Sequence, residues 1–176
     1  MSTPYADAAL DYFNDGWFPL PVGGAKRKAL LVSGWTGGQD NWPDRKQIER
    51  WVEEYPTANI ALRLPKDIIG IDVDMYDGKP GAATIADAEE KLGKLPPTWI
   101  STSRSDGSGI RFYRVPPGLA WPESLTKSFG GGVEIIRWDH RYAIVAPSIH
   151  YTGLEYRWLK PSGETASGEI PGVGDI

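Results

Sequence analysis

The sequence contains no cysteine, and it has only two histidines and two methionines among its 176 residues. Disulfides and thiolate metal sites are therefore excluded. No run of about 18 apolar residues is present that could span a membrane. The first residues, Met1 to Pro4, do not have the pattern of a signal peptide. We expect a soluble, cytoplasmic protein that has no membrane partner.

A strong excess of basic charge is also missing. The 19 lysines and arginines against 23 acidic residues give a net charge of −4. This balance argues against a large nucleic-acid-binding surface, although local basic clusters can still contact phosphates. The sequence has neither a Gly-x-Gly-x-x-Gly turn between a strand and a helix nor a Walker A motif. Dinucleotide binding and P-loop nucleotide binding are therefore not supported.

The sequence does contain enough apolar material for one globular domain, since 40% of its residues are apolar and 24% are charged. Helical periodicity and capping signals predict helices over residues 4–15, 45–55 and 82–92. Apolar runs bounded by turn residues predict strands over residues 17–22, 59–64, 68–75, 98–103, 110–115, 133–137, 142–145 and 156–159.

Short connections predict that several of these strands pair as hairpins. We expect residues 59–64 to pair with 68–75, and residues 133–137 to pair with 142–145. The strands before and after the loop 104–109 form a third hairpin. Together with the helices, this pattern predicts an α+β fold with a mixed, largely antiparallel sheet and packed helices.

The last part of the sequence has a different composition from the rest. From Lys160 onward the chain is rich in Gly, Pro, Ser and Glu, which is typical of a linker or tail. We therefore expect one folded domain over residues 1–159, and a flexible tail over residues 160–176 that leads into a further domain.

The most informative segment is the apolar run from Ile68 to Met75, which carries Asp72 and Asp74. Alternate residues of a strand share a face, so both carboxylates project from one side, about 6.5–7 Å apart along the backbone. Hard divalent cations prefer carboxylate ligands, and an acid in an apolar strand is costly unless a cation compensates it. The pattern favours a site for one or two such cations. The alternative is a strand end whose acids face water.

A small-residue loop, Asp106 to Gly109, lies directly before the strand that carries Arg111. Backbone N–H groups in such a loop, including those of Ser108 and Gly109, are able to hold phosphate oxygens, and an arginine beside them is able to pair with the same oxygens. The alternative interpretation is an ordinary glycine turn.

Four more residues have both a functional and a structural interpretation. Glu134 is a third acid in an apolar strand, and its alternative is a side chain that faces solvent. His150 lies in a tight polar turn, where a hydrogen-bonded structural histidine is the alternative. Lys26 and Lys28 belong to a basic loop that either contacts phosphates or is simply solvated.

In this order and spacing, these features resemble the prim-pol domains of the archaeo-eukaryotic primase superfamily, which are found on replication proteins of phages and plasmids. The resemblance extends from Tyr12 to about Trp158. It rests on an ordered set of short motifs: Tyr12, Gly16 and Trp17; Pro21; Lys26 and Lys28; Gly34-Trp35; Ile48 and Trp51; Asn59-Ile60-Ala61; Gly70-Ile71-Asp72-Val73-Asp74; Leu95-Pro96-Pro97-Thr98; and Pro147-Ser148-x-His150-x-x-Gly153-x-x-Tyr156-x-Trp158.

The resemblance implies template-directed nucleotidyl transfer, as a DNA primase or DNA polymerase, by a two-metal mechanism. It makes Asp72, Asp74 and Glu134 the catalytic ligands of Mg²⁺ or Mn²⁺. The residues that it places at the nucleotide are Ser108, Gly109, Arg111, His150, Lys26 and Lys28. Many relatives have Gly-Gly-x-His where this chain has Ser108-Gly109-Ile110-Arg111, so an arginine replaces the histidine. A guanidinium is still able to clamp a triphosphate.

The implied partners are a single-stranded DNA template and primer, NTP or dNTP, and a fused or associated helicase domain. A phage-encoded protein of this kind acts in the host cytoplasm. Two other functions use the same residues: a two-metal nuclease needs the acids but no triphosphate clamp, and a silent nucleic-acid-binding adaptor of a helicase needs neither. Arg111 argues against the nuclease, and the three acids argue against the adaptor.

Overall fold

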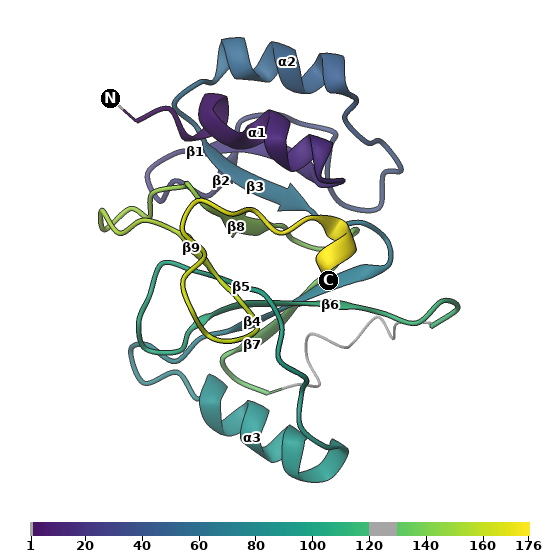
Figure 1. Ribbon diagram of the computed structural model, residues 1–176, viewed down its shortest axis with the longest axis vertical. Coiled ribbons are helices and arrows are strands. Elements are labelled where there is room, and N and C mark those ends of the chain that lie inside the picture. The colour runs from purple at the N-terminus through teal and green to yellow at the C-terminus, as the bar shows by residue number, and fades with distance from the viewer. Residues whose placement is uncertain (1, 120–129) are drawn as a thin grey trace.

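The computed structural model describes residues 2–119 and 130–176. Over these residues the chain forms helices and two antiparallel sheets (Figure 1), which confirms the α+β fold. No helix in the described ranges is long and apolar enough to cross a membrane. The elements are α1 Pro4–Asn14, β1 Phe18–Gly23, β2 Ala29–Leu30, α2 Arg45–Glu54, β3 Asn59–Arg63, β4 Ile68–Val73, α3 Gly81–Leu92, β5 Ile100–Thr102, β6 Gly109–Arg114, β7 Val133–Ile136, β8 Ala143–Val145, β9 Arg157–Leu159 and the 3₁₀ helix η1 Val173–Asp175.

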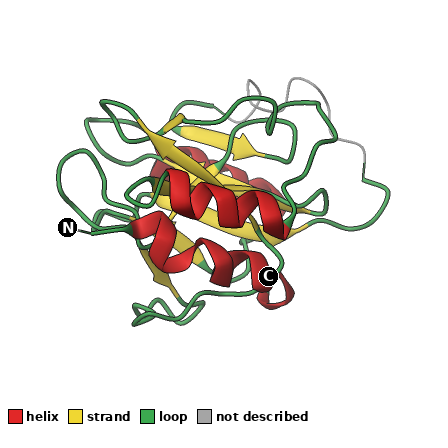
Figure 2. Ribbon diagram, turned by 90° about the horizontal axis from the view of Figure 1, so that it is seen from above, coloured by secondary structure: helices red, strands yellow, loops and turns green. Residues whose placement is uncertain are grey.

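The first sheet has the strand order β2-β1-β3-β8, and α1 and α2 lie side by side over it (Figures 1 and 2). Asp44 is the N-cap of α2, where its carboxylate accepts a hydrogen bond of 2.8 Å from the backbone N–H of Gln47. Ile48 and Trp51 then point into the core from one face of the helix. The local signals were sufficient here, because caps and periodicity act within a few residues.

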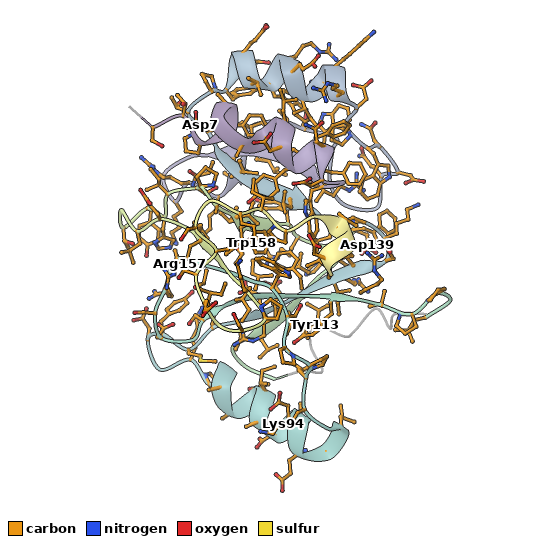
Figure 3. The ribbon with its side chains drawn as sticks, viewed as in Figure 1. Asp7, Lys94, Tyr113, Asp139, Arg157 and Trp158 are labelled. Carbon is orange, nitrogen blue, oxygen red and sulfur yellow. The ribbon has the colours of Figure 1, made fainter. Side chains whose placement is uncertain are left out.

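The second sheet has the order β7-β4-β6-β5-β9, and α3 lies on its outer side (Figure 1). The predicted hairpin around loop 104–109 is confirmed, since β5 pairs with β6. The main core cluster lies between the two sheets and under the first two helices. Trp158 is at its centre (Figure 3), and its indole N–H donates to the hydroxyl of Tyr12 over 2.7 Å.

The two other predicted hairpins are wrong. The strands β3 and β4 belong to different sheets, and the turn Pro65–Asp67 carries the chain from one sheet to the other. The strands β7 and β8 are likewise divided between the sheets. Both β3 and β4 are nearly buried on both faces. Each of these strands is hydrogen-bonded to another strand along both of its edges. The partner strands come from distant segments, so a short connection did not identify the pairing.

The segment after β9, which we expected to be a flexible tail, packs against the domain. Ala166 is buried, and Ile170, Val173 and Ile176 lie against the core. The indole N–H of Trp17 donates to the Pro171 carbonyl over 2.7 Å. The apolar residues spaced along this Gly- and Pro-rich segment explain the difference, because they bury surface without forming a regular element. A further domain beyond residue 176 stays a prediction.

Arg63, at the end of β3, is fully buried and organises the loop before α2. Its guanidinium lies 4.0 Å from the ring centroid of Trp42. All five of its hydrogen bonds go to backbone carbonyls, which belong to Trp35, Gly37, Gln39, Asn41 and Trp138. The side chain of Arg63, which lies outside the irregular segment 33–43, therefore fixes the backbone path of that segment.

We predict that Arg63→Met lowers the free energy of unfolding by about 3 kcal/mol or more, because it removes a buried guanidinium that donates to five backbone carbonyls. Chemical denaturation followed by tryptophan fluorescence measures the loss. The control is Arg50→Met, since the exposed Arg50 in α2 has a single side-chain hydrogen bond within residues 2–119 and 130–176, to Gln47; its cost should stay within about 0.5 kcal/mol. Equal losses in the two variants would contradict this role for Arg63.

Candidate active site

The strand β4 places Asp72 between two partners on one face of the second sheet. In the register of the sheet, Asp72 lies opposite Glu134 of β7 and opposite Ile110 of β6. Directly paired residues share a face and have Cβ atoms about 4.5–5.5 Å apart. The carboxylates of Asp72 and Glu134 are therefore neighbours, and Asp74 follows two residues later on the same side.

The backbone around Asp74 is fixed by a close approach of three segments. The N–H of Asp74 donates to the Gly132 carbonyl over 2.7 Å, and the N–H of Gly81 donates to the Asp74 carbonyl over 3.1 Å. A Cβ atom on Gly81 would lie only 2.4 Å from that carbonyl oxygen. Glycine at this position lets the start of α3 pack against the end of β4, which holds Asp74 in place.

The three acids line one cavity of about 490 Å³. Most of the predicted site residues line it too: Lys26, Lys28, Ser108, Gly109 and His150. The basic loop thus reaches the acids from the first sheet, and the glycine loop and His150 border them from other sides. Sequence reasoning missed several lining residues, namely Tyr76, Ser101, Thr102, Ser103, Arg104, Arg141, Tyr142, Tyr151 and Tyr156.

Two of the three acids are paired with cationic side chains. Asp74 accepts a hydrogen bond of 2.6 Å from the ammonium of Lys79. Glu134 accepts one of 2.9 Å from Arg141 and lies 3.3 Å from the ring of His140. Asp72 has no hydrogen-bond or ion-pair partner in the part of the chain that the structure describes.

The environment of Asp72 disfavours its charged form. Burial, followed by the negative charges of Asp74 and Glu134, raises the pKa of this carboxyl to about 6. The pKa of the His150 imidazole is shifted in the opposite direction, because burial and the positive charges of Lys28 and Arg104 lower it. At neutral pH the cavity therefore holds an uncompensated carboxylate and a neutral histidine.

The donor set fits hard divalent cations. Carboxylate oxygens are their preferred ligands, and a cation beside Asp72 would relieve the repulsion that raises its pKa. Within residues 2–119 and 130–176, no group of three His, Asp or Glu side chains is already arranged around one point. Asp74 and Glu134 would therefore exchange Lys79 and Arg141 for the metal.

Comparison with protein families finds a match to a family described as bifunctional DNA primase/polymerase, N-terminal, over residues 9–172. The chain belongs to this family. A comparison with curated proteins gives no significant match. Membership of the primase/polymerase family supports nucleotidyl transfer of the primase or polymerase type, with DNA and nucleotides as substrates, and it agrees with the cavity of acids and cations.

The cavity that the three acids line does not include Arg111. This residue pairs with Ile71 in β4, so it projects from the face opposite to Asp72. Its guanidinium donates to the carbonyls of Gly107 and Gly109. The residue of β6 that faces the acids is Ile110. The expected triphosphate contact by Arg111 is therefore not supported by this geometry.

The glycine loop also differs from the expected phosphate cradle. The N–H of Ser108 donates to the Asp106 carboxylate over 2.9 Å, and its hydroxyl accepts a hydrogen bond of the same length from the N–H of Met75. Ser108 therefore joins its loop to the end of β4 instead of leaving its N–H group free for a ligand. The sequence signal that was overlooked is Arg104, at the start of this loop.

We predict that Asp72→Asn makes the metal-free protein more stable above pH 6. The folded-state pKa lies above the ordinary value of 3.8, so the stability lost through Asp72 appears as pH rises from about 4 to about 6. The gain at pH 7.5 should be about 2–3 kcal/mol, and it should vanish near pH 4. Thermal or denaturant unfolding in EDTA measures it.

Asp87→Asn, on the exposed side of α3, is the matched control and should change stability little at either pH. A gain for Asp72→Asn that is equally large at pH 4 would show that charge is not its cause.

Proposed function

We propose that this domain catalyses template-directed nucleotidyl transfer, as a DNA primase or DNA polymerase, with Mg²⁺ or Mn²⁺. The observation that carries the proposal is the shared face of Asp72, Asp74 and Glu134, which opens on a cavity that also contains Lys28 and Arg104. A site that joins a hydroxyl to a nucleoside triphosphate needs both kinds of charge: acids for the cations and basic groups for the phosphates.

In this proposal, Asp72, Asp74 and Glu134 hold two divalent cations. When bound, these cations would activate the primer 3′-hydroxyl and neutralise the leaving pyrophosphate. Lys28 and Arg104 attract the triphosphate, and the backbone of Lys28 is held in position because its carbonyl accepts a 2.6 Å hydrogen bond from Tyr142. Lys26 adds positive charge from the same loop. His150 borders the nucleotide as a neutral group.

The alternative of a two-metal nuclease uses the same acids. Arg111 does not reach the cavity and so does not distinguish the two functions. Lys28 and Arg104 do line it and favour nucleotidyl transfer, since phosphodiester hydrolysis has no triphosphate to bind. The proposal also includes a single-stranded template with primer, a fused or associated helicase, and a role in phage or plasmid replication in the cytoplasm.

Primer extension on single-stranded DNA tests the function directly. We predict that Asp72→Asn, Asp74→Asn and Glu134→Gln each lower the rate of nucleotide addition about a hundredfold or more, since metal-assisted charge stabilisation is worth several kcal/mol. Asp87→Asn is the control on an exposed surface. The assay is run with dNTP and with NTP, and with and without a primer, in Mg²⁺ and in Mn²⁺.

Two outcomes would count against the proposal. Metal-dependent shortening of the oligonucleotide with no addition would indicate the nuclease. Near-normal extension by the Glu134→Gln variant would remove this residue from the metal site.

A further inference from the structure

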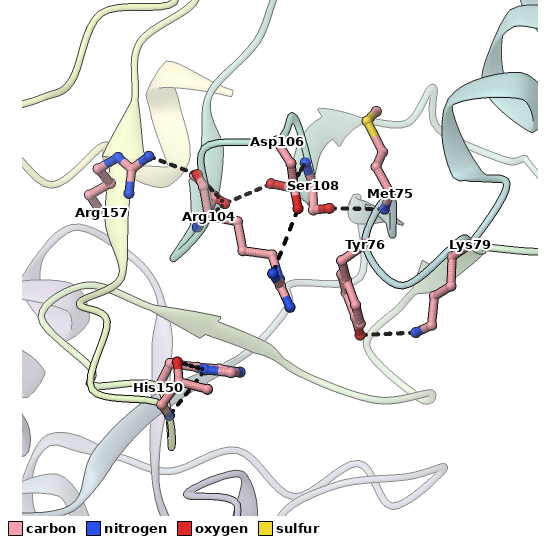
Figure 4. A network of polar contacts seen from close by, with 10 residues as sticks. Met75, Tyr76, Lys79, Arg104, Asp106, Ser108, His150 and Arg157 are labelled. Atoms are coloured by element: carbon pink, nitrogen blue, oxygen red, sulfur yellow. Dashed lines mark hydrogen bonds and ion pairs between the residues drawn. The ribbon is translucent and has the colours of Figure 1, made fainter.

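Tyr76 and Arg104 line the cavity, and the Tyr76 ring contacts both Arg104 and Lys79. Figure 4 shows Arg104 and Lys79 on either side of it. The guanidinium carbon of Arg104 lies 3.9 Å from the ring centroid, and the ammonium of Lys79 lies 4.3 Å from it. The ammonium also donates to the Tyr76 hydroxyl over 2.9 Å. An aromatic ring attracts cations to its face, so one side chain fixes two positive charges.

The backbone of Arg104 is held from two sides. Its N–H donates to the Thr102 hydroxyl over 2.9 Å, and its carbonyl accepts a 2.7 Å hydrogen bond from Arg157. The guanidinium itself has one weak ion pair in the described ranges, 3.6 Å from Asp106. Most of its N–H donors are therefore available to a ligand. Arg104 lines the cavity, and its positive charge contributes to lowering the pKa of the His150 imidazole.

Lys79 is shared between Tyr76 and Asp74. Its ammonium contacts the Asp74 carboxylate and the Tyr76 hydroxyl at the same time, and both contacts raise the pKa of Lys79. If a divalent cation replaces Lys79 at Asp74, the ammonium still has its contact with Tyr76. It then lies beside the metal with donors free, and a polyphosphate that bridges metal and protein carries the complementary charge.

We propose that Arg104 and Lys79, held on Tyr76, form the subsite for the terminal phosphates of the nucleoside triphosphate, and thus for the pyrophosphate that leaves. The proposal deepens the function above and rests on it for the identity of the ligand. Arg104 provides a planar fork for phosphate oxygens, whereas Lys79 couples phosphate binding to the metal at Asp74. Tyr76 positions both cations and makes no contact with the reacting atoms.

Inorganic tripolyphosphate is the probe, since it carries the phosphate chain without a base or a sugar. Calorimetric titration of the full chain in Mg²⁺ should give a Kd that Arg104→Met raises about tenfold and Lys79→Met about fivefold. Tyr76→Leu should weaken binding more than Tyr76→Phe, because phenylalanine keeps the ring that attracts Arg104. The control is Lys94→Met, an exposed lysine beyond the opposite end of α3 (Figure 3).

A second titration distinguishes the terminal phosphates from the phosphates of a nucleic-acid strand. With a single-stranded oligothymidine, the Arg104 and Lys79 variants should bind within about twofold of the wild-type protein. If they lose the oligonucleotide and keep tripolyphosphate, these residues contact the template and the proposal is wrong. Unchanged tripolyphosphate binding in the Arg104 and Lys79 variants would also overturn it, even where the Tyr76 variants fail to fold.

The tripolyphosphate titration and the primer-extension assay test different claims, so one can fail while the other succeeds. Extension by the wild-type protein with unaltered tripolyphosphate binding in the variants would leave the function standing and remove the subsite. Binding that depends on Arg104 and Lys79, in a protein that adds no nucleotide, would leave a polyphosphate site and remove the proposed function.

Discussion

The pairing of Asp72 with Glu134 across two neighbouring strands is the constraint on which the rest of the site depends. It concentrates negative charge on one face of a sheet whose other face contains the apolar cluster of Ile71, Val73 and Ile135. Repulsion between the acids, added to burial, disfavours the charged form of Asp72. A sheet designed only for stability would not keep this arrangement.

The surrounding structure supplies positive charge from separate parts of the chain. Lys79 comes from the loop before α3, Arg141 from the turn between β7 and β8, and Lys28 from the hairpin of the first sheet. That turn also contains Trp138, whose carbonyl accepts a hydrogen bond from the buried Arg63. The fold thus connects its most buried cation to the segment that reaches Glu134. The site is assembled where the two sheets meet, and neither sheet contains all of it.

The helices and the acidic strand were predictable, because their signals are local. Asp44 caps the start of α2, Gly93 lies at the end of α3, and the acids alternate with apolar residues at β4. Each of these signals involves only a few neighbouring residues. Strand pairing was not predictable in the same way. The apolar strands β3 and β4 are adjacent in sequence, yet each pairs with segments far along the chain. Nothing in their composition distinguishes a hairpin from a crossing between sheets.

The same limit explains which site residues were found. Asp72 and Asp74 were proposed from their positions in an apolar strand and Glu134 from the family resemblance, and the structure brings all three to one cavity. Arg111 was predicted to contact the triphosphate, but it lies on the face opposite to Asp72; that face depends on the register between β4 and β6, where a shift of one residue reverses every side chain. Arg104 and Tyr76 were missed because their importance comes from their contact with each other, which joins two loops that are distant in sequence.

The central claim is that the paired acids exchange protein cations for divalent metal. A crystal structure with Mn²⁺ and a non-hydrolysable nucleoside triphosphate, with manganese located by its anomalous scattering, tests it most directly. The account predicts manganese bound by Asp72, Asp74 and Glu134, with Lys79 and Arg141 displaced from their carboxylates. Manganese bound elsewhere, with both ion pairs intact and the nucleotide outside the cavity, would contradict it.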